Sequence, residues 1–114
     1  MIKSSFKRND SGQIVSFEVS GHAESGPYGS DIVCAAVSAL TISTVNGIDA
    51  LAGFEPIVET NEDEGGYLYV EMISNANQEQ TNIAQILLEN LLLGLQAIEQ
   101  ESLEFIQVKT INEK

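Results

Sequence analysis

Residues 31–53 read DIVCAAVSALTISTVNGIDALAG, and this stretch decides the fold. Apolar side chains recur along it at helical spacing, at Val33, Ala36, Val37 and Leu40. Ser30 or Asp31 suits an N-cap position, and an acidic Asp31 complements the positive end of the helix dipole. Gly47 and Gly53 are stop signals. The sequence therefore predicts a helix from near Asp31 at least to Asn46, continuing as one piece or two.

The segment before this helix predicts a β-hairpin. Ile2 and Phe6 share one face of a first extended segment, and apolar residues alternate in a second one, at Val15, Phe17 and Val19. Residues 8–12, RNDSG, have turn chemistry and join the two. Residues 21–30 contain three glycines, a proline and two serines, a composition typical of a loop with freedom to move.

The segment after the helix predicts a second hairpin, a second helix and a last strand. Residues 57–58 are extended, residues 61–66 form an acidic turn, and residues 67–72 alternate as a strand with two usable faces. Residues 77–101 predict the helix, and residues 103–108 the closing strand. The order ββαββαβ indicates a single domain over residues 1–114, of the α+β class, with two helices packed on one face of a mainly antiparallel sheet.

The second helix carries a wider apolar stripe than one sheet contact needs. Its main face holds Ile83, Ile86, Leu87, Leu91, Leu95 and Ile98, and Leu88 and Leu92 lie beside that face. Surplus apolar surface on so small a domain indicates a homodimer, and a fully buried central helix is the alternative.

Charge excludes several classes of function. The 114 residues include 17 acidic and 5 basic ones, for a net charge of −12, and every basic residue lies in the first eight or last six positions: Lys3, Lys7, Arg8, Lys109 and Lys114. Direct nucleic-acid binding, phosphoryl transfer and attraction to anionic membranes all need cations that the body of the chain lacks. A basic protein partner or a neutral substrate fits better, unless the acidity serves only solubility.

Location follows from the termini and the single cysteine. The N-terminus has no signal-peptide pattern, and the most apolar stretch, residues 83–98, is too short and too polar to span a bilayer. One cysteine cannot form an internal disulfide. We therefore expect a cytoplasmic protein with a reduced thiol.

The one histidine and the one cysteine lie twelve residues apart, at the two ends of the glycine-rich loop. His22 follows a strand, and Cys34 is predicted in the first turn of a helix, where unsatisfied amides and the helix dipole stabilise a thiolate. His22 can take the thiol proton, and the same amides can serve as an oxyanion hole. The pair predicts a nucleophilic cysteine.

Other interpretations of these residues stay open at this stage. Cys34 is flanked by small apolar residues and can be inert core, His22 can be a loop residue, and Asp31 can be only a helix cap. A redox-sensing thiol would lack a resolving cysteine in the chain. One nitrogen, one carboxylate and one sulfur fall short of a structural zinc site, so neither a metal nor another cofactor is predicted.

Two motifs carry a resemblance to a known family. Gly21-His22-Ala23, the glycine-rich loop, and SDIVCAAVS at residues 30–38 resemble the signature of the Prp family of ribosomal-processing cysteine proteases. The length, the order of elements and the acidic character are similar to that family from end to end. The resemblance implies an endopeptidase with Cys34 as nucleophile and His22 as general base.

The resemblance also implies a substrate and partners. It implies removal of a short apolar N-terminal extension, ending in aromatic residues, from the precursor of a large-subunit ribosomal protein, by a homodimer whose loop moves aside for substrate. Asp31 matches an acidic position of the family, either as a third catalytic member or as a helix cap. Tyr28 is among the apolar residues near the loop that could receive aromatic side chains. The alternative function is a non-catalytic acidic binding module for a basic ribosomal protein.

Overall fold

The chain alternates strands and helices in the predicted order. The computed structural model describes residues 1–21, 30–61 and 66–113, with the side chains of residues 30 and 31 outside this description. Its elements are β1 (Ile2–Arg8), β2 (Ile14–Ser20), α1 (Ser30–Gly47), the π-helix η1 (Ile48–Ala52), β3 (Ile57–Thr60), β4 (Tyr67–Glu71), α2 (Gln78–Glu101) and β5 (Ile106–Asn112). The predicted order ββαββαβ is confirmed.

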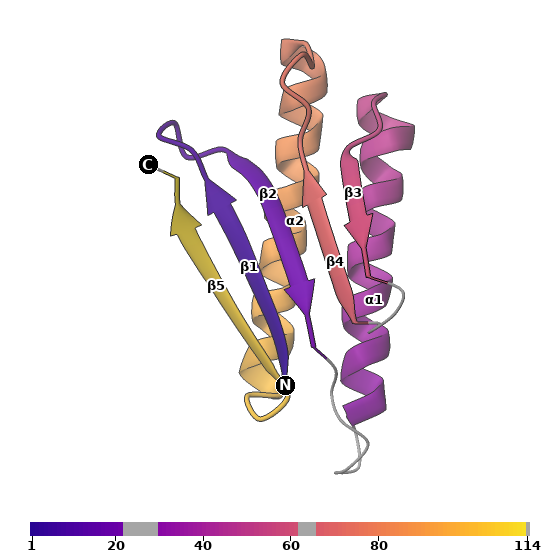
Figure 1. Ribbon diagram of the computed structural model, residues 1–114, viewed down its shortest axis with the longest axis vertical. Helices are drawn as coiled ribbons and strands as arrows, with labels where there is room; N and C mark the ends of the chain where they lie inside the picture. Colours follow the sequence, from indigo (N-terminus) through magenta and orange to yellow (C-terminus); the bar gives the residue numbers. More distant parts are fainter. Residues whose placement is uncertain (22–29, 62–65, 114) are drawn as a thin grey trace.

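The five strands form one sheet in the order β3-β4-β2-β1-β5. All neighbours are antiparallel except β1 and β5, which run parallel. Both helices cover the same face of this sheet, and no helix of the described residues lies on the other face (Figure 1). The predicted α+β fold, with two helices on one face of a mainly antiparallel sheet, is confirmed.

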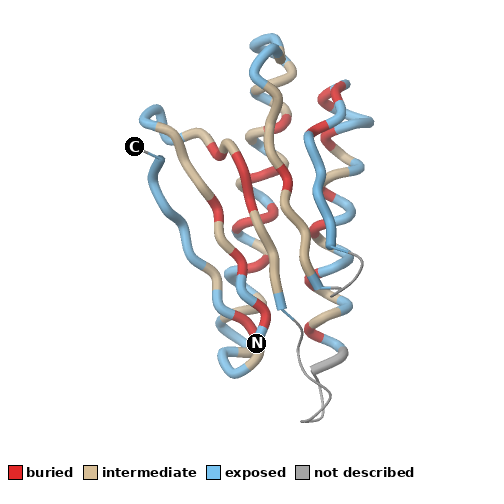
Figure 2. Tube along the Cα trace, viewed as in Figure 1, coloured by how far each residue is buried: buried red, intermediate tan, exposed pale blue. Residues whose placement is uncertain are grey.

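The core lies between the sheet and α2. Phe6 of β1 stands opposite Phe17 of β2, and the two rings stack with centroids 5.5 Å apart. Leucines of α2 lie in the same buried cluster, at Leu88, Leu91, Leu92 and Leu95. Figure 2 shows buried residues along the central strands and at intervals along both helices.

Three details differ from the sequence prediction. Leu88 and Leu92 are buried, at 0% and 5% exposure, so the surplus face proposed for dimer contact belongs to the monomer core. Both the sheet and α1 pack on α2, which explains its wide apolar stripe. Ile86, placed on the core face, is 69% exposed. The last strand begins at Ile106 instead of Leu103, which is exposed in a turn.

The helix ends follow local chemistry. Asn77 caps α2, since its side chain accepts a hydrogen bond from the Gln80 amide while the Gln80 side chain accepts one from the Asn77 amide. The first helix divides in two, with η1 following α1 directly after Gly47. Gly53 ends η1 with φ +81°, a left-handed conformation that favours glycine.

α1 packs closely on α2 but stands away from the sheet. Gly94 of α2 faces Leu40 of α1, and the lack of a side chain there lets the helices approach. The backbone of α2 comes close to β2 and β5, whereas α1 has no comparable contact with the strands. The separation between α1 and the sheet leaves room for a pocket, described below.

The outer side of α1 and η1 is apolar and largely exposed. Residues Ile32–Ala52 are long and apolar enough to cross a membrane by length and composition, a test that the core helix of a soluble protein also meets. Only 28% of this window is buried in the monomer. Exposed side chains along it include Ile32, Ala35, Ala39, Ile42 and Leu51.

On the helix-free face of the sheet, basic and acidic side chains lie on different strands. The strand register aligns Glu59, Tyr69, Glu18, Ser5 and Lys109 across the five strands. Lys3 and Lys7 share the face of Lys109, so three basic residues from the two ends of the chain meet on β1 and β5. The acidic residues gather on β2, β3 and β4.

Candidate active site

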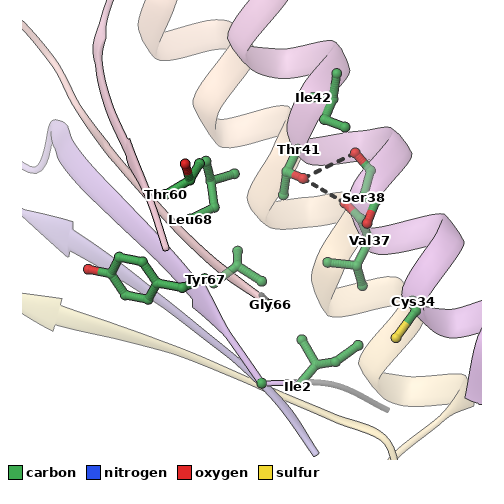
Figure 3. A pocket seen from close by; sticks show the side chains of 12 residues that line it. Ile2, Cys34, Val37, Ser38, Thr41, Ile42, Thr60, Gly66, Tyr67 and Leu68 are labelled. Atoms are coloured by element: carbon green, nitrogen blue, oxygen red, sulfur yellow. Dashed lines mark hydrogen bonds between the residues drawn. The ribbon is translucent and has the colours of Figure 1, made fainter. Parts of the chain in front are cut away.

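Cys34 lies near the N-terminal end of α1 and is half-buried. α1 begins at Ser30, so Cys34 is the fifth helical residue and stands at the start of the second turn instead of in the first. The amides without a helical partner therefore belong to the turn that precedes Cys34. Figure 3 shows the Cys34 side chain directed from α1 toward the side where Ile2 lies.

A pocket of about 380 Å³ separates α1 from the sheet, and Cys34 is part of its wall. The helix side also includes Val37, Ser38, Thr41 and Ile42. The sheet side is formed by Ile2, Val19, Gly21, Thr60, Gly66, Tyr67 and Leu68. This volume suits one or two side chains of a peptide or a small ligand.

The lining is apolar and uncharged. None of the described residues around the pocket is acidic or basic, although the chain carries a net charge of −12. The Thr41 hydroxyl is satisfied inside its own helix, because it donates to the carbonyl oxygens of Val37 at 2.9 Å and Ser38 at 3.1 Å. The pocket therefore favours apolar groups and holds few polar atoms for recognition.

Tyr67 stands at the rim between the pocket and the helix-free face. Figure 3 shows its ring pointing away from α1. Partial burial raises the pKa of Tyr67, and the negative charges of Glu18 and Glu59 raise it further. Glu18 of β2 and Glu59 of β3 thus lie on the helix-free face, and neither lines the pocket.

Gly21, the residue that precedes the histidine in the sequence, lies in the pocket wall. It has φ +88°, and its amide donates to the carbonyl oxygen of Gly66 at 2.8 Å. A side chain at this position would collide with the carbonyl oxygen of Met1. Gly21 lines the same pocket as Cys34, and His22 is bonded to it directly.

The remaining predicted site residues lie outside the described part of the chain. His22 and Tyr28 belong to residues 22–29, and the side chain of Asp31 is likewise outside the description. Among the described residues, no group of three or more His, Cys, Asp or Glu side chains could hold a metal ion.

Comparison with known proteins decides the family. The family profile of cysteine protease Prp matches residues 1–107. The chain belongs to this family. The ribosomal processing cysteine protease Prp of Bacillus subtilis is 38% identical over 110 residues, which cover 96% of this chain and 97% of the relative. The Staphylococcus aureus protein of the same name is 37% identical over 100 residues, covering 88% and 90% of the two chains.

Solved structures agree with the Prp assignment. A crystal structure of a Streptococcus mutans protein superposes with a TM-score of 0.87 at 37% identity, covering 99% of this chain and 96% of the other. The Prp protease of S. aureus with a covalently linked product peptide gives 0.83 at 34% identity, covering 97% and 100%. The same protease with a substrate peptide gives 0.85 at 32% identity and equal coverage. This chain is therefore a cysteine protease of the Prp family, with the fold of its relatives.

Sequence signals point to Cys34 but not to the pocket around it. The sheet side comes from two hairpins, β1–β2 and β3–β4, that are distant from each other in the sequence, and no local pattern predicts their meeting. One signal was available: alternation over residues 67–72 puts Leu68 on the face of the sheet that looks toward the helices. A second signal is the helical spacing of Cys34, Val37 and Thr41, which puts these residues on one stripe of the helix, and this stripe lines the pocket.

Proposed function

We propose that the protein is an endopeptidase that removes a short apolar N-terminal extension from a large-subunit ribosomal protein. One observation carries this proposal: Cys34, near the start of a helix, opens onto an uncharged apolar pocket between α1 and the sheet. An apolar peptide segment ending in aromatic residues has the character that such a pocket accepts. The S. aureus relative, solved with substrate and product peptides, supports a peptide substrate.

The proposed chemistry begins with the transfer of the Cys34 proton to His22. The thiolate attacks the scissile carbonyl carbon, and the backbone amides at the start of α1 stabilise the resulting oxyanion. Collapse of this intermediate breaks the C–N bond, and His22 returns its proton to the leaving amine. Water, activated by His22, then hydrolyses the thioester and frees the thiol.

His22 is proposed as the base because of its attachment. Adjacent Cα atoms are about 3.8 Å apart, so the backbone of His22 begins within one residue of the pocket wall at Gly21. Asp31 lies three residues before Cys34 on α1. It either orients His22 or acts only on the helix terminus, and the two roles are separated by experiment below.

Charge supports a basic protein substrate over a nucleic acid. Of the described basic residues, Arg8 is paired with Glu89, and the three lysines of β1 and β5 form a patch on the face away from the pocket. A chain with charge −12 attracts a basic ribosomal protein and is repelled by RNA, which favours action before ribosome assembly. We propose a cytoplasmic enzyme without direct nucleic-acid or membrane binding.

We propose a homodimer that uses the outer side of α1. Two copies with charge −12 repel each other, so a stable contact requires a surface without acidic groups. No charged residue occurs between Ile32 and Ile48, and the exposed side chains from residue 32 to residue 47 are Ile, Ala, Ser and Asn. This surface replaces the one around Leu88 and Leu92, which is buried within the monomer.

Substitution of the nucleophile tests the catalytic proposal. Cys34→Ser and Cys34→Ala should abolish cleavage of the ribosomal protein precursor while leaving the circular dichroism spectrum unchanged, because a hydroxyl is a far weaker nucleophile. Ser43→Ala, on the exposed side of α1, is the matched control and should keep wild-type activity. Mass spectrometry of the product gives the cleavage site. Retained cleavage in purified Cys34→Ser would leave the non-catalytic acidic binding module as the better description.

A further inference from the structure

β3 is an edge strand of the described sheet. Among the described residues it lies at the end of the strand order and pairs with β4 alone, so no described strand pairs with its other flank. All four residues of Ile57–Thr60 are exposed, and they include two apolar β-branched side chains and no lysine or proline. A lysine or proline on an edge strand usually hinders its pairing with a further strand, and Lys109 is such a residue on β5 at the opposite edge. The β3 edge therefore offers backbone donors and acceptors to another strand.

This edge is continuous with the active-site pocket. Thr60, the last residue of β3, lines the pocket together with Cys34. Its cross-strand neighbour Leu68 lies in the same wall. Ile42 of α1, which is 57% exposed, borders the pocket from the helix side. A chain lying along β3 would thus pass directly into the pocket.

We propose that the substrate peptide binds by adding a strand to β3. The four residues of β3 span about 13 Å, enough to pair with about four residues of an extended peptide. Main-chain hydrogen bonds would supply affinity, and alternate side chains would face α1 and enter the pocket. This inference rests on the proposed peptidase function and adds where the peptide backbone is held.

Electrostatics favours a substrate over a second copy at this edge. Pairing of two β3 strands would bring together two chains of charge −12, each with Glu59 in the strand. Like charges that face each other across strands are destabilising. A segment from a basic protein has no such penalty.

The first test uses backbone-methylated peptides. Synthetic peptides spanning the cleaved junction of the ribosomal protein precursor are N-methylated at one position each, so that each lacks one backbone N–H. Strand addition predicts that methylation raises KM by about five- to tenfold at every second residue of the segment that pairs with β3, whether that segment lies N-terminal or C-terminal to the scissile bond. Methylation of the residues in between should have little effect. Sensitivity confined to the two residues at the scissile bond, while cleavage proceeds, would overturn the inference and leave the peptidase function intact.

The second test locates the contact on the protein and does not need turnover. Hydrogen exchange of Cys34→Ala protein is measured with and without the unmodified peptide. We expect added protection in residues 57–60 and none in β5, which serves as the control edge. Absence of protection in residues 57–60 at saturating peptide would refute strand addition. Protection that rises with protein concentration alone would assign the edge to a second copy and also overturn it. Failure of wild-type protein to cleave the unmodified peptide would count against the peptidase function, not against this contact.

Discussion

Arg8 of β1 and Glu89 of α2 form a two-point ion pair. Nη1 of Arg8 lies 2.5 Å from Oε2 of Glu89, and Nη2 lies 2.9 Å from Oε1. Nη1 also donates to the carbonyl oxygen of Gly12 at 2.7 Å, so the guanidinium joins the β1–β2 turn to α2. The pocket adjoins the opposite end of β1, at Ile2, and so the pair stabilises the fold without touching the active site.

Glu89→Gln should lower stability slightly without affecting activity. Both side chains are partly exposed, so we expect a loss of about 0.5 kcal/mol in the free energy of unfolding at pH 7. The hydrogen bonds from Arg8 lower the pKa of Glu89 below its ordinary value of 4.5. The contribution is therefore present above pH 4.5 and is lost as the pH falls through the folded-state pKa.

Urea unfolding of wild type and Glu89→Gln at pH 7 and pH 3 measures this dependence. The stability difference between the two proteins should shrink at the lower pH, because the carboxyl group is then increasingly protonated. A double-mutant cycle with Arg8→Met isolates the pair from other effects. An equal difference at both pH values would contradict the assigned role of the carboxylate.

Gly21→Ala should damage both stability and catalysis, whereas Gly12→Ala should affect stability alone. Both glycines have positive φ, +88° and +84°, so each substitution costs about 1 kcal/mol of backbone strain. Gly12 has open space around it, but a methyl group on Gly21 would collide with the Met1 carbonyl oxygen. The collision would displace the strand end that leads to His22.

Thermal unfolding and kcat/KM of the two alanine variants provide the comparison. The difference between the variants removes the shared strain and reports the collision with Met1 and its effect on the pocket. Equal melting temperatures and equal activities in the two variants would show that Gly21 is not needed for the position of this segment.

Local sequence signals predicted the elements, and tertiary packing decided the details that they missed. Apolar periodicity and glycine stop signals predicted α1 nearly to the residue but left open whether the helix divides, which it does after Gly47. The end of α2 at Glu101 was also predicted, whereas the start of β5 was not, because Leu103 is apolar yet exposed in a turn. The burial of Leu88 and Leu92 depends on where α1 packs, and no local pattern in the sequence predicts that position.

The candidate site likewise has one feature that the sequence predicts and one that depends on tertiary packing. The thiol at the start of a helix could be predicted because helix termini have a fixed electrostatic character. The pocket could not, since it depends on the separation between α1 and the sheet and on Thr60 and Leu68 from strands far along the chain. The pocket forms only because the strands lie in this order in the sheet.

Ala39→Glu should convert the proposed homodimer to monomers. Ala39 is exposed in the middle of the uncharged side of α1, so a carboxylate there would be buried against its copy. Leu93→Glu on the exposed side of α2, where Leu93 is 65% exposed, is the control and should leave the dimer intact. Leu92→Glu, by contrast, should unfold the protein, because Leu92 is a core residue. Light scattering over a range of concentrations checks all three. A wild-type protein that is monomeric at every concentration would reject the dimer.

His22→Ala and Asp31→Asn should separate the general base from the helix cap. If His22 takes the thiol proton, His22→Ala should remove nearly all cleavage and slow the alkylation of Cys34 at neutral pH, because only the helix terminus then favours the thiolate. Asn caps a helix about as well as Asp, so Asp31→Asn should retain much of the activity if Asp31 acts only on the helix terminus. An orienting carboxylate would not be replaced by an amide, and activity would then fall by orders of magnitude.

The measurement is the rate of Cys34 alkylation between pH 5 and pH 9 in wild type and both variants. The profile of His22→Ala should be displaced to higher pH, and that of Asp31→Asn should stay close to the wild type if Asp31 acts only on the helix terminus. A profile of His22→Ala that superposes on the wild type would show that the thiol and the imidazole are not coupled, and the base would then have to be sought elsewhere along the pocket.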